Sequence, residues 1–390
     1  MKVRAAVRMA NVQEYYFSRK LKEITQRRIS GANIINLGIG SPDLAPPAAV
    51  VDALSQSLAA PGIHQYQSYA GIQELREAMA DWYACMYGVT LDSAREVLPL
   101  IGSKEGIMHI SMAYLSPGDQ VLVPDPGYPT YTAAAELSGA SIIKYKLHEE
   151  TAWLPDLEAL SLLDLKRVKI MWINYPHMPT GAIATSGFFE KLIAWARKHR
   201  ILICNDNPYS LILNETPLSI LQIEGAKEVA LELNSLSKSH HMAGWRIGMV
   251  CAAEEHIANI IRFKSNMDSG MFRGLQVAAV AALQTPTTWH TRQNEIYRER
   301  KKTGIQILQQ IGCTVQKPQA GLFVWGRIPP AADDGFSLSE DILNAAEMFI
   351  TPGGIFGEQG KNYLRLSLCN PVQRLQEALD RLKKIKPTAL

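Results

Sequence analysis

The 390-residue sequence predicts an α/β protein with two domains, a large one built on a mostly parallel sheet and a smaller α+β one. Three observations support this fold class. Short apolar runs alternate with longer segments of helical periodicity along most of the chain. Toward the C-terminus, a long, charged amphipathic segment is then followed by strand-like runs. Hydrophobic residues make up 47% of the chain, which is enough to bury a large core.

The large domain is expected to span residues 46–285. Strands alternating with helices in this way are typical of a parallel sheet that is covered on both faces. The helix predicted at residues 187–197 ends in basic residues, which suit a helix C-terminus. The apolar runs predict strands at residues 120–124, 168–173 and 201–204, with helices between them at residues 130–137 and 187–197.

The smaller domain is expected to comprise residues 286–390 together with an N-terminal arm, residues 1–45. It begins with the amphipathic helix at residues 288–310 and continues with strand-like runs at residues 322–325 and 363–368. No internal repeat or low-complexity segment interrupts the chain.

Charge and cysteine content disfavour several classes of function. The 40 basic and 37 acidic residues nearly cancel to +3, without a long run of Lys or Arg, so nucleic-acid and membrane-surface binding are disfavoured. The five cysteines have no CxxC or metal-ligand spacing, so no metal site is predicted and reduced thiols of a cytoplasmic protein are expected. Residues 1–11 do not develop an apolar stretch followed by a cleavage site, and no uncharged apolar span of about 18 residues occurs, so neither secretion nor membrane insertion is expected.

Lys238 is the strongest candidate for a catalytic residue. It ends the sequence SLSK, and the sequence GWRIG follows at residues 244–248. A lysine amine condenses with an aldehyde, while the hydroxyl of Ser235 and the guanidinium of Arg246 can hold a phosphate. Pyridoxal phosphate (PLP) carries an aldehyde and a phosphate on one ring. Taken alone, a lysine among serines is more often part of a solvated loop.

Two further segments can contribute to a cofactor site. Asp206 and Tyr209 follow a predicted strand, at the edge where open α/β sheets bind ligands, and an acid there can keep a ring nitrogen protonated. An Asx turn is the structural alternative. Ser103 and Lys104 precede a helical segment, so backbone N–H groups there can cradle a phosphate. A simple helix cap is the alternative for this pair.

Tyr128 and Arg365 complete the set of candidates. Tyr128 follows the predicted strand at residues 120–124 and can stack on a planar ring, although a core tyrosine is also possible. Arg365 lies in an apolar strand and needs a partner there, because an unpaired buried charge is costly. A substrate carboxylate and an internal acid both remain open as that partner. The sequence LGIGSPD at residues 37–43 lacks the third glycine of a dinucleotide fingerprint.

These motifs together resemble the class I/II aminotransferases of PLP fold type I, over residues 36–368. GSKEG and KSNMDSGMF (264–272) are most similar to the branches with bacterial LL-diaminopimelate and broad amino-acid aminotransferases. The motifs that carry the resemblance are LGIGSPDLAPP (37–47), YQSYAGIQELR (66–76), GSKEG (102–106), PDPGYPTY (124–131), PTG (179–181), DNPY (206–209), residues 235–248 and PGGIFGEQGKNYLRL (352–366).

The resemblance implies a seven-stranded, mostly parallel sheet and a complete cofactor site. Lys238 forms a Schiff base with PLP, Asp206 pairs with the pyridinium nitrogen, and Tyr209 hydrogen-bonds the phenolic oxygen. Tyr128 stacks on the ring, Gly40 leaves room for the substrate, and Arg365 binds its α-carboxylate. The phosphate is held by the backbone of Ser103 and Lys104, by Ser235 and Arg246, and by Tyr66 from the other subunit of a homodimer.

Met178 departs from the family pattern. The resembling enzymes have asparagine before the sequence PTG, and its amide donates a second hydrogen bond to the phenolic oxygen. Met178 cannot make this bond. Asn174, four residues earlier, compensates only if the loop is rearranged.

The function that the resemblance implies is transfer of an amino group between an L-amino acid and a 2-oxo acid, in amino-acid metabolism. A PLP-dependent carbon–sulfur β-lyase is an alternative, because such enzymes share the first chemical steps. A non-catalytic PLP-fold binding or regulatory protein is a more distant alternative. The sequence does not identify the amino donor or acceptor.

Overall fold

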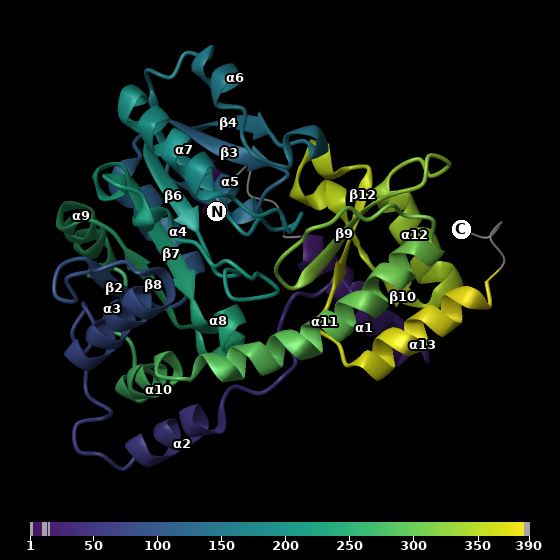
Figure 1. Cartoon of the computed structure of the whole chain (residues 1–390), viewed down its shortest axis with the longest axis horizontal. Coiled ribbons are helices and arrows are strands. Elements are labelled where there is room, and N and C mark those ends of the chain that lie inside the picture. Colours follow the sequence, from purple (N-terminus) through teal and green to yellow (C-terminus); the bar gives the residue numbers. More distant parts are fainter. Residues whose placement is uncertain (1–2, 10–13, 15, 386–390) are drawn as a thin grey trace.

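A computed structural model describes residues 3–9, 14 and 16–385, so the interpretation of residues 1–11 falls partly outside the described residues. The chain is built on a seven-stranded sheet of order β2-β8-β7-β6-β5-β3-β4 (Figure 1). β8 is antiparallel to both neighbours and the other pairs are parallel, which confirms the predicted sheet. The strands are β2 (Val97–Leu100), β3 (Gln120–Asp125), β4 (Ser141–Lys146), β5 (Val168–Ile173), β6 (Leu202–Asp206), β7 (Ala230–Ser235) and β8 (Gly248–Cys251).

Helices cover both faces of this sheet, because successive residues of a strand point to opposite faces. In β5, Ile170 and Trp172 belong to a core cluster with residues of α4, α5 and α9, while Met171 and Ile173 belong to a second cluster with residues of α3 and α7. α5 and α7 confirm two predicted helices. The helices of this part are α2 (Ala48–Ser57), α3 (Gln73–Tyr87), α4 (Ser103–Tyr114), α5 (Pro129–Leu137), α6 (Leu157–Ser161), α7 (Ser186–His199), α8 (Leu236–Ser239), α9 (Glu254–Lys264) and α10 (Arg273–Leu283).

A smaller antiparallel sheet of order β11-β12-β9 lies beside the large one, and α11 runs from α10 toward it (Figure 1). The N-terminal arm joins this part, because β1 pairs with β10 in parallel. The domain boundaries at residues 46 and 285 stay a prediction. The elements here are α1 (Tyr16–Ile29), β1 (Ile35–Asn36), α11 (Thr287–Gln310), β9 (Phe323–Arg327), α12 (Gly335–Ala346), β10 (Met348–Phe349), β11 (Thr351–Pro352), β12 (Tyr363–Ser367) and α13 (Val372–Lys383).

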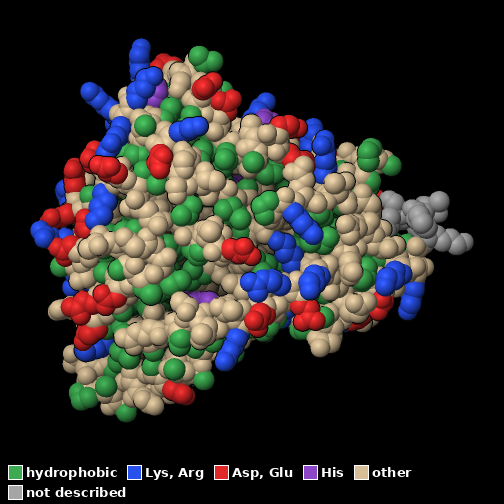
Figure 2. Space-filling model, viewed as in Figure 1, with side chains coloured by type: hydrophobic (Ala, Val, Ile, Leu, Met, Phe, Trp, Pro, Cys, Tyr) green, Lys and Arg blue, Asp and Glu red, His purple; other side chains and the backbone are tan. Residues whose placement is uncertain are grey.

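Acidic and basic side chains are interspersed over the face of the molecule shown in Figure 2, without one sign covering it. All five cysteines are free thiols, and four of them are buried while Cys85 is exposed. Within the described ranges, no helix is long and apolar enough to cross a membrane.

Candidate active site

The carboxyl ends of three neighbouring strands place polar residues along one edge of the large sheet. β6 ends at Asp206, β7 ends at Ser235, and Asn174 directly follows β5. Ligands of open α/β sheets bind at this edge. A cavity of about 350 Å³ lies here and extends to β9 and β12 of the small sheet. Ten of the eleven predicted site residues line it: Gly40, Ser103, Lys104, Tyr128, Asp206, Tyr209, Ser235, Lys238, Arg246 and Arg365.

Lys238 reaches the cavity from α8, the short helix that follows β7. Its Nζ donates a hydrogen bond to the carbonyl oxygen of Gly40 at 2.7 Å. Burial lowers the pKa of Lys238, and the positive charges of Arg365 and Arg246 lower it further. A lowered pKa increases the fraction of neutral amine, which is the nucleophilic form.

Asp206 has a buried carboxylate, and only one of its two oxygens is hydrogen-bonded among the described residues. Its Oδ2 accepts a hydrogen bond from the hydroxyl of Tyr131 at 2.9 Å, while Oδ1 has no hydrogen-bond partner among the described residues. Burial raises the pKa of Asp206 from its ordinary value near 3.8 to about 6, against the hydrogen bond from Tyr131. A buried acceptor of this kind fits a cationic donor, such as a protonated ring nitrogen.

Tyr131 is a site residue that sequence reasoning missed. It lies on α5 three residues after Tyr128, and its ring stacks on Trp172 with centroids 5.0 Å apart. The ring of Tyr128 meets that of Tyr131 edge to face at 5.6 Å. The spacing of Tyr128 and Tyr131 could have indicated this, because residues three apart at a helix start lie on one face.

The first turn of α4 and the loop around Arg246 form an anion cradle. Ser103 begins α4, and Gly102 before it has φ of 84°. A Cβ on Gly102 would lie 2.2 Å from Nη2 of Arg246, and a Cβ on Gly248 would lie 2.6 Å from the backbone nitrogen of Ser103. The absence of a Cβ therefore lets the guanidinium of Arg246 lie close to Gly102, and the backbone N–H of Ser103 lie close to Gly248. Such an arrangement suits a phosphate.

Hydroxyl groups complete the cradle. Arg246 donates from Nη1 to Oγ of Ser237 at 3.3 Å and to the carbonyl oxygen of Ala243 at 2.9 Å. Ser235 caps α8, because its Oγ accepts from the backbone nitrogen of Ser237 at 3.1 Å. Ser237 lines the cavity too and is a second residue missed from sequence, although it lies inside the SLSK motif.

Tyr209 presents a phenol to the same cavity from the loop after β6. Burial raises the pKa of Tyr209, while the positive charge of Arg365 opposes this shift. The phenol is therefore protonated at neutral pH and can donate a hydrogen bond. Burial also raises the pKa of Tyr128.

Arg365 lies on β12 with its guanidinium held from several sides. Nη2 donates to the carbonyl oxygen of Gly38 at 2.8 Å, and Nη1 contacts Sδ of Met178 at 3.3 Å. The rings of Phe323 and Phe356 have centroids 3.9 and 4.6 Å from its Cζ. A guanidinium held this way suits bidentate binding of a carboxylate.

Neither Met178 nor Asn174 replaces the side-chain amide of the asparagine that the resembling enzymes have before the sequence PTG. Asn174 donates from Nδ2 to the backbone oxygen of Asp206 and accepts at Oδ1 from the backbone nitrogen of Met178 at 2.7 Å. Both ends of its amide are thus engaged in holding the loop. The thioether of Met178 lines the cavity beside Arg365, so it contributes to the end of the cavity that holds this guanidinium.

Gly40 is required by close packing, since a Cβ there would lie 2.3 Å from Cζ of Phe323. Tyr66 is the one predicted site residue that does not line this cavity. Its side chain is 90% exposed, on the segment between α2 and α3.

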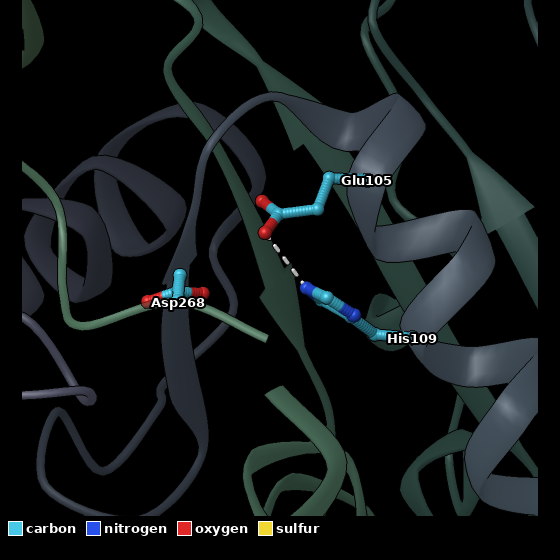
Figure 3. Close-up of side chains that lie close together, drawn as sticks. All are labelled: Glu105, His109 and Asp268. Carbon is cyan, nitrogen blue, oxygen red and sulfur yellow. Dashed lines mark hydrogen bonds and ion pairs between the residues drawn. The ribbon is translucent and has the colours of Figure 1, made fainter. Parts of the chain in front are cut away.

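A second group of titratable side chains consists of Glu105 and His109 on the first two turns of α4 and Asp268 on the loop after α9 (Figure 3). Nε2 of His109 lies 2.8 Å from a carboxylate oxygen of Glu105, and the other oxygen accepts from the backbone nitrogen of Ile101 at 2.6 Å. Asp268 pairs with Lys264 at 2.9 Å. The start of α4 and the loop after α9 therefore bring three titratable groups close together, and Lys264 supplies a cation to Asp268 there.

Comparison with known proteins places the chain and its fold in one family. Residues 32–382 match the family described as aminotransferase class I and II. The LL-diaminopimelate aminotransferase of Desulforudis audaxviator is 41% identical over 97% of each chain, and that of Aquifex aeolicus is 40% identical over 97% of this chain and 98% of the relative.

Solved structures give the same result. Substrate-bound BacF from Bacillus subtilis has a TM-score of 0.94 and 34% identity over 98% of both chains. A single mutant of Thermus thermophilus aspartate aminotransferase has a TM-score of 0.91 and 25% identity over 100% of both chains. The chain therefore belongs to the class I and II aminotransferase family, whose members use PLP, and is an aminotransferase of fold type I.

Proposed function

We propose that this aminotransferase binds PLP through Lys238 and moves an amino group between an L-amino acid and a 2-oxo acid. When bound, PLP supplies an aldehyde that takes up the amine and a ring that withdraws electrons from the α-carbon. One observation carries the proposal. The amine of Lys238, the unpartnered Oδ1 of Asp206 and the guanidinium of Arg365 all line one cavity.

Each residue has a distinct role in this proposal. Lys238 holds the cofactor and, once released, carries a proton to and from the substrate α-carbon. Asp206 keeps the ring nitrogen protonated, and Tyr209 donates to the phenolic oxygen. Arg365 binds the α-carboxylate, which orients the substrate. The phosphate contacts the start of α4 at Ser103 and Lys104, together with Ser235, Ser237 and Arg246, while Tyr128 packs on the ring.

The active form is proposed to be a homodimer. Tyr66 is exposed in a single chain, yet its motif serves the neighbouring subunit's phosphate in the resembling enzymes. A second copy of the chain would therefore complete each site. Free thiols at all five cysteines support a cytoplasmic location.

The names of the curated relatives make LL-diaminopimelate the first amino donor to test. Purified protein loaded with PLP is incubated with pairs of amino acids and 2-oxo acids, while transfer is followed separately from release of ammonia or thiol. Transfer without such release supports the proposal. Release of ammonia or thiol without transfer would instead assign a lyase.

A further inference from the structure

The turn between β2 and α4 carries backbone groups on one side of the anion cradle. β2 ends at Leu100 and α4 begins at Ser103, so Ile101 and Gly102 make the connection. The first N–H groups of a helix have no partner within the helix, and those of α4 start at Ser103, which lines the cavity. The position of this turn therefore decides whether these N–H groups reach a phosphate.

The turn has little room to move. Leu100 pairs with Gly248 of β8, where a Cβ would lie 2.6 Å from the backbone nitrogen of Ser103. Gly102 has φ of 84° and ψ of 151°, a combination that is nearly confined to glycine. A Cβ on Gly102 would lie 2.2 Å from Nη2 of Arg246. A displacement of the turn would therefore change how the N–H groups of α4 lie relative to this guanidinium.

Glu105 holds the turn from the first turn of α4. Its Oε2 accepts a hydrogen bond from the backbone nitrogen of Ile101 at 2.6 Å. Its Oε1 lies 2.8 Å from Nε2 of His109, one turn further along the helix (Figure 3). A glutamate at the third position of a helix commonly reaches back to an N–H at the helix start. Here the same bond fixes the residue next to Gly102.

His109 fixes the carboxylate of Glu105 in turn. The histidine is buried, and its ring packs on that of Phe263 of α9 with centroids 5.5 Å apart. A packed ring keeps Oε1 in place, so that Oε2 stays directed at Ile101. Glu105 and His109 lie outside the set of residues that line the cavity. Any effect that they have on a bound molecule must therefore pass through the backbone of the turn.

We propose that Glu105 is a positioning residue for the phosphate of the cofactor, acting through the backbone of Ile101 and Gly102 and supported by His109. The inference rests on the proposed function, because it takes the start of α4 as part of the phosphate cradle. Glu105 does not contact the phosphate in this proposal. It determines where the N–H of Ser103 lies.

The test compares two ligands that differ only in the phosphate. The full-length chain without cofactor is titrated with PLP and, separately, with pyridoxal, and binding is followed by the change in visible absorbance. The ratio of the two dissociation constants reports on the phosphate, since the aldehyde and the ring are common to both ligands. Comparing this ratio between variants cancels the solution chemistry of free pyridoxal.

Three variants probe the two contacts of Glu105. Glu105→Ala is expected to weaken PLP binding about tenfold and to leave pyridoxal binding within about twofold. Glu105→Gln can still accept from Ile101 and donate to His109, so it is expected to keep PLP binding within about threefold of the wild type. His109→Leu removes only the outer contact, and a loss of about threefold is expected.

Glu158→Ala is the matched control, because Glu158 is an exposed glutamate in the first turn of another helix, α6. It is expected to leave both dissociation constants unchanged. Thermal unfolding shows which variants are folded. If Glu105→Ala does not fold, the ratio in His109→Leu decides the question.

The outcomes separate this inference from the proposed function. An equal loss of affinity for PLP and pyridoxal would give Glu105 a purely structural role and overturn the inference. An unchanged ratio in the folded variants would also overturn it, as would a loss in Glu105→Gln as large as that in Glu105→Ala. Equal binding of PLP and pyridoxal by the wild type would instead contradict the phosphate cradle itself, and with it this part of the proposed function.

Discussion

The two ends of the cavity differ in how they are built. The cofactor end is polar and comes from segments that follow strands of the large sheet, with Asp206, Ser235 and Lys238 within 33 residues of sequence. The substrate end is largely apolar and comes from positions as distant as Ile39 and Arg365. In the proposed function, the polar end binds the cofactor that many aminotransferases share, and the end at Arg365 contacts the substrate.

The largest effect is expected at the cofactor end, from Lys238→Ala. Losing both the covalent anchor and the proton carrier should lower kcat by about 10⁴-fold or more. Steady-state assays with saturating PLP measure it. The matched control is Lys301→Ala, which removes another lysine whose pKa is lowered by burial and whose Nζ donates to Gln319, away from the cavity. Wild-type rates in Lys238→Ala would contradict the catalytic role that we propose for Lys238.

At the substrate end, Arg365→Ala should lower kcat/KM roughly 100-fold, because it removes charge-assisted hydrogen bonds to the α-carboxylate worth about 1.5 to 3 kcal/mol each. The loss should fall mainly on KM. Arg365→Lys keeps the charge without the planar fork, so an intermediate loss is expected. An unchanged KM in both variants would place the carboxylate elsewhere.

Asp206 gives the cofactor end a pH dependence. Its pKa is raised by burial from near 3.8 to about 6, so the folded protein binds more protons than the unfolded one between these values. The free energy of unfolding of the PLP-free protein should therefore fall by about 2 to 3 kcal/mol as pH rises from 4 to 6. Asp206→Asn should lose this slope. Urea unfolding at several pH values measures it, and a slope of opposite sign would contradict the assignment.

The contrast between the two ends also explains what could be predicted from sequence. Strands β3, β5 and β6 and helices α5 and α7 were predicted because apolar periodicity is local, and Lys238, Asp206 and Arg246 lie in short motifs. Phe323 and Phe356 were not predicted as site residues. They surround Arg365 only through pairing of β9 with β12 and packing of the segment after β11, which no local pattern encodes.

The contact of Met178 could not be predicted from the sequence either. Its departure from the family pattern is visible in the sequence, but the contact of Sδ with Arg365 depends on the loop after β5 meeting the small sheet. Likewise, the engagement of both ends of the Asn174 amide follows from tertiary geometry. Local motifs pointed to the candidate cofactor residues, and long-range packing determined what surrounds Arg365.

A smaller effect is expected for Tyr66→Phe, which removes one hydrogen bond to the phosphate across the proposed dimer interface. Such a bond to a charged group is worth roughly 1.5 to 3 kcal/mol, so PLP affinity should fall about tenfold to 100-fold. Equilibrium titration with PLP measures it. Sedimentation should show a dimer at assay concentrations, and a fully active monomer would refute the shared site.

The smallest effect is expected where the two ends meet, at Met178. Met178→Asn adds a donor near the phenolic oxygen, so the apparent pKa of the lysine-linked cofactor should fall. Tyr209→Phe should raise that pKa, and by more in the wild type than in the Met178→Asn background. Spectral titration measures both shifts. If neither substitution moves the titration, neither side chain faces the ring oxygen.

The attachment of the cofactor to Lys238 is the central claim, and reduction of the PLP-loaded protein with borohydride tests it most directly. Peptide mapping by mass spectrometry then locates the reduced, covalently bound cofactor. The account predicts a single label on the peptide that contains Lys238, and no label in Lys238→Ala. A label on Lys104 or another lysine, or no label on a protein that has bound PLP, would contradict it.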